Sequence, residues 1–276
     1  MPASGLPSFA TDTGVTVVEP GRWSATVHEG WDIAGNANGG YLLAIAARAM
    51  AGAAERPDPV TLTAHYLSPG RPGPAEVRTS VVKSGKRFTT VQATLVAGGR
   101  PLLAVLGTFG DLAPTEGAPA PSRVDESPPD LPPVDECVPL VPSDDAGGMP
   151  PPFARRVEIR MHPGDAGFSR GRPSGDMRLR GWFRLPDEQP LDTLALVLAS
   201  DAYPPTIFNA DLPVGWTPTV ELTTHVRARP APGWLRCAFT TRFVTGGFLE
   251  EDGVVWDDTG TLVAQSRQLA LVPRPV

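Results

Sequence analysis

Hydrophobic and polar residues alternate with the period of a β-strand in two series of short segments along the chain. In the first series these segments are 22–32, 60–67, 75–83, 87–96 and 101–109. In the second series they are 154–161, 177–185, 219–227, 234–244, 253–257 and 261–272. Gly and Pro separate most of the segments, which is typical of turns between strands, so both series predict antiparallel sheet.

Each series also contains one segment that predicts a helix. Residues 41–54 are rich in Ala and Leu, and Asn38 or Gly39 is placed to cap the first turn. Because this helix is apolar on nearly every side, we expect it to be buried. In the second series residues 191–201 predict a helix that the Pro-Pro pair at 204–205 brings to an end.

The two series align without a gap at an offset of 160 residues, which is 225 − 65. The matched positions are Val60, Leu62, Thr63, His65, Pro72, Gly73, Phe88, Leu102 and Ala104 with Val220, Leu222, Thr223, His225, Pro232, Gly233, Phe248, Leu262 and Ala264. This register predicts a tandem duplication of one unit: a strand, a long buried helix and four antiparallel strands. The fold class is α+β, and a curved antiparallel sheet around one helix is the hotdog architecture. Two copies predict a double hotdog, and a generic α+β duplication is the alternative.

The segment between the two series lacks any periodicity. Residues 111–151 are dense in Pro, Asp, Glu and Ser, and this composition predicts an extended linker. We therefore expect an N-terminal repeat at 1–110, the linker at 111–151 and a C-terminal repeat at 152–276.

Composition narrows the class of function. The chain has 276 residues, 41% of them hydrophobic, with a formal net charge of −6 and a pI near 5.3. The charge of this globular chain does not indicate a basic surface for nucleic acid or anionic membrane. No apolar run approaches the roughly 18 residues of a membrane span, and the first residues lack the features of a signal peptide. We expect a cytoplasmic protein without nucleic-acid or membrane partners.

The cysteines and histidines do not predict a metal site. Cys137 and Cys237 stand in no Cys-x-x-Cys pattern, and four histidines are scattered along the chain. We expect two free thiols, no metal and no cofactor.

Three polar residues are candidate site residues. Two of them stand at positions where an apolar residue would be expected, and the third begins a strand. Gln268 shares one strand face with Ala264 and Ala270, and it aligns with Thr108 of the first series. A buried amide without partners is costly, so this difference between the copies marks Gln268 as a candidate site residue.

The other two candidates leave alternatives open. Asp201 continues the apolar helical stripe of Leu194, Val197 and Leu198, and it either faces the interior or caps the helix in solvent. Thr219 begins a strand and either binds a water or is an ordinary β-branched strand residue. Its alternation places it on the polar face, unless a bulge near the preceding proline reverses the phase or the residue lies at the rim of the sheet.

Several blocks of the sequence resemble a known family. They read GNANGGYLLAIAARAM, TLTAHYLSPGRPGP, SGKRFTTVQATL, ASDAYPP, TPTVELTTHVRARPAPGWL and GTLVAQSRQLAL. Their order is similar to that of the acyl-CoA thioesterase II group of double-hotdog hydrolases, and to its actinobacterial thioesterase-like branch. The resemblance implies an acyl-CoA substrate, a role in fatty acid metabolism, a homo-oligomer, and a catalytic water held by Asp201, Thr219 and Gln268.

This chemistry needs an oriented water and a donor for the developing oxyanion, without a covalent nucleophile. The backbone of Asn38, Gly39 and Gly40 at a helix start is the expected donor and substrate-binding segment, unless the two glycines only relieve crowding. No Gly-x-Ser-x-Gly, P-loop or dinucleotide-binding pattern is present. Two other functions stay open: a non-catalytic acyl-thioester-binding or scaffold protein, and a hydratase. A hydratase would need an Asp/His pair in the pocket, for which His162 and Asp165 are the nearest case.

Overall fold

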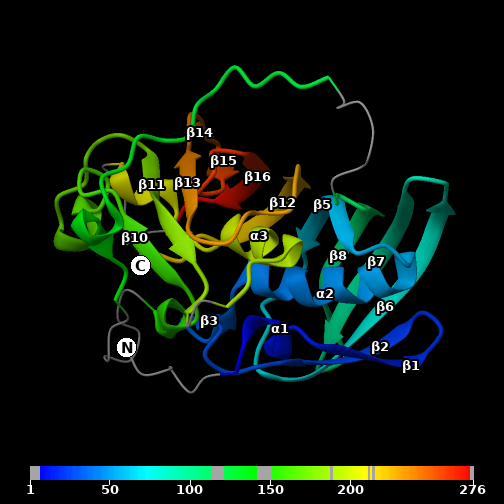
Figure 1. Ribbon diagram of the computed structural model, residues 1–276. Helices are drawn as coiled ribbons and strands as arrows, with labels where there is room; N and C mark the ends of the chain where they lie inside the picture. The colour runs from blue at the N-terminus through cyan, green and yellow to red at the C-terminus, as the bar shows by residue number, and fades with distance from the viewer. Residues whose placement is uncertain are drawn as a thin grey trace.

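The computed structural model describes residues 7–113, 121–141, 151–186, 189–210, 212 and 215–273. One antiparallel sheet runs through the molecule in the order β1-β2-β6-β7-β8-β5-β12-β16-β15-β13-β11-β10-β9 (Figure 1). Its first half consists of β1 (Val15–Glu19), β2 (Arg22–Val27), β5 (Asp58–Tyr66), β6 (Gly73–Ser84), β7 (Thr89–Ala97) and β8 (Arg100–Gly110). Its second half consists of β9 (Val138–Pro139), β10 (Glu158–Met161), β11 (Arg178–Arg184), β12 (Thr219–Val226), β13 (Leu235–Thr240), β15 (Phe248–Trp256) and β16 (Leu262–Leu271). The short strand β14 (Val244–Thr245) pairs with β15, and β3 (Asp32–Ile33) and β4 (Asn36–Ala37) form a separate ribbon.

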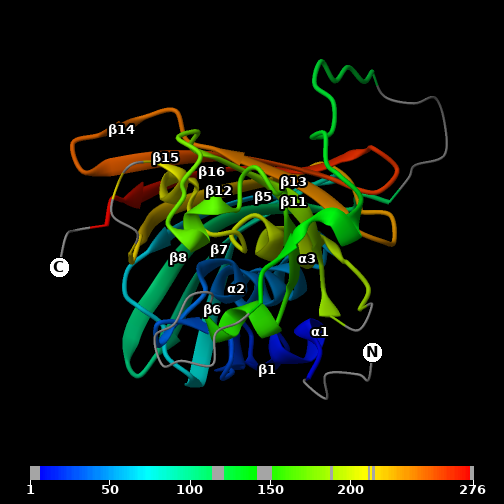
Figure 2. The same cartoon turned by 90° about the vertical axis from the view of Figure 1, so that its left-hand side faces the viewer.

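The helices lie on the concave side of this sheet. Figure 2 shows α2 (Gly39–Ala54) and α3 (Thr193–Ala199) beneath the layer formed by β5, β12, β16 and β15. α2 packs against β5, β6, β7 and β8 and against α3. The remaining helical segments are α1 (Phe9–Asp12) and the short 3-10 turns η1 (Val134–Glu136), η2 (Pro152–Arg155), η3 (Gly167–Arg170) and η5 (Thr206–Asn209). No helix within the described ranges is long and apolar enough to cross a bilayer.

The first predicted helix is confirmed and begins two residues earlier than expected. Asn38 caps it, because its side-chain oxygen accepts the N–H of Tyr41 at 2.9 Å. The helix is buried on every side except at a few positions, as its apolar surface predicts. The second helix is shorter than the predicted 191–201. Asp192 caps it through the N–H of Ala195, and it ends at Ala199 after seven residues.

The two halves of the sheet meet at a local pseudo-twofold axis. β5 pairs antiparallel with β12, and Thr63 lies directly opposite Thr223. These two residues are 160 apart, and their hydroxyl oxygens are 2.9 Å from each other. A residue that pairs with the equivalent residue of the other repeat lies on the symmetry axis. The 160-residue offset found in the sequence therefore relates equivalent positions of the two halves in space as well. The duplication and the double-hotdog fold are therefore confirmed.

Several strand boundaries differ from the prediction. The segment 22–32 is broken, because Gly30 adopts a φ of 81° between β2 and β3. The segment 234–244 is divided into β13 and β14, and the predicted 253–257 is the second half of β15. β1 was not predicted at all. It covers the edge of β2, as an edge hairpin.

The proline-rich segment lies partly outside the described residues, at 114–120 and 142–150. In the described stretch 121–141, regular structure is confined to η1 and β9. β9 pairs with β10, so this part of the predicted linker contributes an edge strand to the second half. The division of the chain into three regions stays a prediction. Cys137 and Cys237 are both free, as expected, and both are buried.

Candidate active site

A cavity of about 370 Å³ lies between the two halves. It is bounded by the start of α2, the segment after α3, and the ends of β12, β15 and β16. The apolar part of its lining includes Ile33, Leu42, Tyr66, Tyr203, Phe239 and Leu249, and the polar part includes Asn38, Asp201, Thr219, Glu251 and Gln268. A concave, mainly apolar site of this size with a few polar groups is typical of small-molecule binding.

Gln268 lies on the inner face of β16. Its cross-strand neighbours are Leu222 on β12 and Glu251 on β15, both of which are buried. The Nε2 group of Gln268 donates a hydrogen bond to the Oγ1 atom of Thr219, at 2.5 Å. The amide predicted from the strand pattern therefore has a partner and lines the cavity.

Thr219 reaches this face because β12 contains a bulge. Thr219 lies opposite Ala270, whereas Leu222 lies opposite Gln268, so three steps along β12 match two steps along β16. One extra residue on a strand reverses its alternation. Of the two alternatives for the phase of Thr219, the bulge is thus present, between Thr219 and Glu221.

Asp201 follows α3 and faces the start of α2. Its Oδ2 atom accepts hydrogen bonds from the N–H of Gly40 at 2.7 Å and from Asn38 Nδ2 at 3.1 Å. Asn38 Nδ2 also donates to the carbonyl oxygen of Asp201, at 2.8 Å. Burial raises the pKa of Asp201 to about 6, and the bonds from Gly40 and Asn38 limit that rise. The carboxyl group lines the cavity and does not cap its own helix.

The two glycines at the start of α2 allow the helices to approach closely. A Cβ atom on Gly39 would lie 2.9 Å from the Asp201 Oδ2 atom and 2.9 Å from the ring of Tyr66. On Gly40 it would lie 2.9 Å from the Cβ atom of Asp201. The glycines therefore do relieve crowding, and they also bring the positive end of the helix dipole to the acid. In this arrangement the N–H of Gly40 serves Asp201, so its expected role as an oxyanion donor stays a prediction.

Two further polar residues of the cavity were not predicted. Glu251 is 8% exposed, and its Oε2 atom accepts the N–H of Thr206 at 2.8 Å. Tyr66 has a buried hydroxyl group to which no hydrogen-bond partner is assigned. The offset of 160 would have revealed Glu251, because it aligns with Val91, a core residue of the first half.

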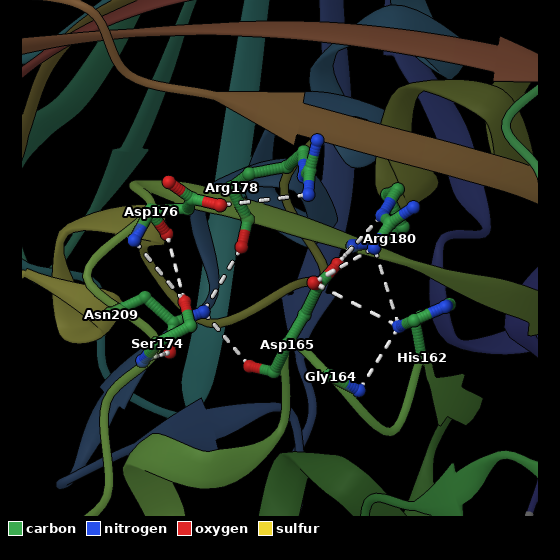
Figure 3. Close-up of polar contacts among 8 residues, drawn as sticks. All are labelled: His162, Gly164, Asp165, Ser174, Asp176, Arg178, Arg180 and Asn209. Atoms are coloured by element: carbon green, nitrogen blue, oxygen red, sulfur yellow. Dashed lines mark hydrogen bonds and ion pairs between the residues drawn. The ribbon is translucent and has the colours of Figure 1, made fainter.

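The pair of His162 and Asp165 lies elsewhere (Figure 3). Asp165 forms a two-pronged ion pair with Arg180, at 2.9 and 3.0 Å, and its carbonyl oxygen accepts from Asn209 Nδ2 at 2.8 Å. His162 Nδ1 accepts the N–H of Gly164 and lies 3.9 Å from Asp165. This cluster joins β11 to η5, and among the described lining residues of the cavity there is no histidine. The Asp/His pair required for a hydratase is absent from that lining.

Comparison with known proteins agrees with the fold. A profile of the acyl-CoA thioesterase N-terminal domain matches residues 27–110, and one of the C-terminal domain matches residues 128–272. The double-hotdog fold and these matches define a thioester hydrolase. The chain belongs to the acyl-CoA thioesterase family.

Individual relatives extend over nearly the whole chain. A candidate thioesterase II from Thermobifida fusca is 35% identical, with a TM-score of 0.86, and covers 99% of this chain and 100% of its own. An uncharacterized protein of Mycobacterium tuberculosis is 32% identical over 92% of this chain and 94% of its own. An acyl-CoA thioesterase II from Mycobacterium marinum, 17% identical with a TM-score of 0.71 over 97% and 99% of the two chains, shares the fold.

Proposed function

We propose that the protein hydrolyses acyl-CoA to a free acid and CoA, with a water molecule oriented by Asp201, Thr219 and Gln268. The observation that carries this proposal is the convergence of these three residues on one cavity. They come from three separate elements, and the bulge in β12 brings Thr219 to the face that carries Gln268.

The hydrogen bonds indicate how a water would be held. Thr219 Oγ1 accepts from Gln268, so its own proton is left to donate to the oxygen of the water. The Oε1 atom of Gln268 accepts one proton of that water, and the Asp201 carboxylate accepts the other. A lone pair of the water then points toward the thioester carbon, as a near-attack arrangement requires.

Asp201 acts as the general base. With a pKa of about 6 it is mostly ionised at neutral pH and is a stronger base than an exposed carboxylate. The water oxygen bonds to the carbonyl carbon while its proton passes to Asp201. The carbon–sulfur bond then breaks, and the thiolate of CoA takes up that proton as it leaves.

In this proposal two groups stabilise the oxyanion. The backbone at the start of α2 carries the partial positive charge of the helix, although the N–H of Gly40 already donates to Asp201. The hydroxyl of Tyr66 is the second, because its ring lies against Gly39 and its pKa is raised well above the usual value by burial and by Asp201. A phenol with a raised pKa stays protonated and remains a donor. A cytoplasmic location and a homo-oligomeric state remain predictions.

The test is thiol release from a panel of acyl-CoA thioesters with short, long, branched and aromatic acyl groups. We expect Asp201→Asn and Gln268→Ala each to lower kcat by about 100-fold or more, with folding unchanged by circular dichroism. Gln265→Ala is the matched control, because Gln265 lies on the same strand with its side chain on the opposite face. Release that is absent for every thioester would leave a non-catalytic acyl-thioester-binding protein. Release that is equal in all variants would overturn the roles proposed for Asp201 and Gln268.

A further inference from the structure

Within the described part of the chain, the charged side chains that line the cavity are all acidic. Two carboxylic acids, Asp201 and Glu251, line it, and no lysine, arginine or histidine is found among its described lining residues. Like charges in a confined site of low polarity repel strongly, because little water is present to screen them. An acyl group with its own carboxylate would meet two acids and no cation.

Glu251 is held in place rather than free to turn away. It lies on the inner face of β15, opposite Gln268, where neighbouring side chains are in direct contact distance. The N–H of Thr206 donates to its Oε2 atom at 2.8 Å, which ties it to the segment that follows Asp201. Burial, and the charges of Asp201 and Glu250, raise the pKa of Glu251 to about 7, so the group is charged in mildly alkaline solution.

The neighbouring acid on the same strand behaves differently. Glu250 accepts the backbone N–H of Arg242 at 2.9 Å and lies 3.6 Å from its guanidinium, on the opposite side of β15. It is not part of the cavity lining. A carboxylate with a cationic partner and one without such a partner are therefore adjacent in sequence and face opposite sides of the sheet.

We propose that the cavity accepts neutral acyl groups and rejects acyl groups that carry a carboxylate, and that Glu251 is the residue that sets this discrimination. The inference rests on the proposed function, since it concerns the acyl group of the same substrate. The catalytic acid Asp201 contributes repulsion as well, but Glu251 does so without a role in orienting the water.

The expected size of the effect follows from Coulomb repulsion. Two like charges about 6 Å apart, at an effective dielectric constant of about 20, disfavour binding by about 100-fold. The experiment compares pentanoyl-CoA, 5-hydroxypentanoyl-CoA and glutaryl-CoA at pH 8. These acyl groups have the same chain length, and the hydroxyl compound separates polarity from charge.

We expect the kcat/KM of glutaryl-CoA to lie about 100-fold or more below that of pentanoyl-CoA, with the hydroxyl compound close to pentanoyl-CoA. Glu251→Gln keeps an acceptor for the N–H of Thr206 and removes the charge, so it should raise the glutaryl-to-pentanoyl ratio by about 10-fold or more. Glu250→Gln removes the same charge from the opposite face and should leave the ratio unchanged.

Three results would overturn the inference: equal rates for the two acyl groups in the wild type, an unchanged ratio in Glu251→Gln, or the same change in both variants. If no thioester is hydrolysed, the proposed function fails instead. The inference is then decided by calorimetry with non-hydrolysable oxoalkyl-CoA analogues of pentanoyl-CoA and glutaryl-CoA. Tighter binding of the neutral analogue, by about 10-fold or more, supports it, and equal binding overturns it.

Discussion

Asp201 shows how one partly buried residue can combine opposing effects. Burial favours the protonated acid, whereas the N–H of Gly40 and the amide of Asn38 favour the carboxylate. The balance places the pKa at about 6, between that of an exposed aspartate and neutral pH. A base with such a pKa is ionised under working conditions and still accepts a proton readily.

The pH dependence of kcat/KM should report this balance. Because only the carboxylate accepts a proton from water, we expect kcat/KM to fall about 10-fold per pH unit below about pH 6 and to level off above it. The variant Glu251→Gln shows which acid causes the inflection, because in this variant Asp201 is the only one of the two cavity acids that still titrates. An inflection near pH 6 that persists in this variant belongs to Asp201, and one that disappears does not.

The same pKa has a consequence for stability. The pKa of Asp201 in the folded protein lies above its model value of 3.8, so the folded state binds the proton more tightly than the unfolded state. Stability from this group is complete below about pH 4 and is lost as the pH rises to about 6, by at most about 3 kcal/mol. Asp201→Asn should therefore melt at a higher temperature than the wild type at pH 8, with a smaller difference at pH 4. A variant that melts lower at pH 8 would contradict this account.

The sequence predicts some of these residues and not others, for physical reasons. Gln268 is visible because strand alternation has a fixed period, and Asp201 because it continues an apolar helical stripe. Glu251 belongs to an acidic run at 250–252 that interrupts the apolar pattern of β15, so only the repeat offset, which aligns it with Val91, marks it as an inward-facing position. The orphaned hydroxyl of Tyr66 depends on contacts across the chain, which alternation does not encode.

At the scale of elements, the contact between α2 and α3 depends on one glycine. Ala is about 1 kcal/mol more favourable than Gly inside a helix, so Gly40→Ala would ordinarily stabilise α2. Here the new Cβ atom would lie 2.9 Å from Asp201 Cβ and 3.2 Å from the carbonyl oxygens of Val197 and Leu198. Backbone atoms cannot move aside cheaply, so the helices must separate.

We expect Gly40→Ala to lower the free energy of unfolding by about 1–3 kcal/mol and to reduce kcat, because the bond from Gly40 to Asp201 is stretched. Urea unfolding measures the first effect and thiol release the second. Gly215→Ala is the control, since its Cβ atom would meet Pro273 at an ordinary 3.4 Å. A stabilised Gly40→Ala protein with full activity would contradict this account, because it would show that α2 and α3 can accommodate the added methyl group without separating.

The bounds of helices and strands were predicted well where Gly and Pro mark their ends. They were predicted less well where a capping residue sets the start of a helix or a bulge changes the phase of a strand. The capping residue Asp192 sets the start of α3, so the apolar pattern alone made this helix too long. The bulge in β12 is defined by its pairing with β16, and the sequence indicated it only as one of two ways for Thr219 to reach the inner face.

At the scale of the whole molecule, the repeat offset predicted two equivalent halves but not the contacts that join them. The Thr63–Thr223 pair places the seam at β5 and β12. Beside that seam Asp58, at the start of β5, is 3% exposed and binds Arg229, which follows β12, at 2.8 Å. Asp58 also accepts the hydroxyl of Thr193 at 3.0 Å, so one buried acid of the first half is held by two residues of the second.

Loss of this contact should weaken the whole molecule rather than one repeat. Arg229→Ala leaves the buried charge of Asp58 with only the hydroxyl of Thr193 and the N–H of Leu112 as partners, and an uncompensated buried charge is costly. Because Arg229 itself is half exposed, we expect a loss of about 2 kcal/mol in the free energy of unfolding, measured in urea.

Arg267→Ala removes a similar two-pronged pair with Asp252 on the outer face, and an exposed pair of this kind contributes less than about 1 kcal/mol. Both variants should unfold in one transition if the halves are a single cooperative unit. Equal losses in the two variants would mean that the seam contributes no more than the surface does, and two separate transitions in Arg229→Ala would mean that the repeats are stable without each other.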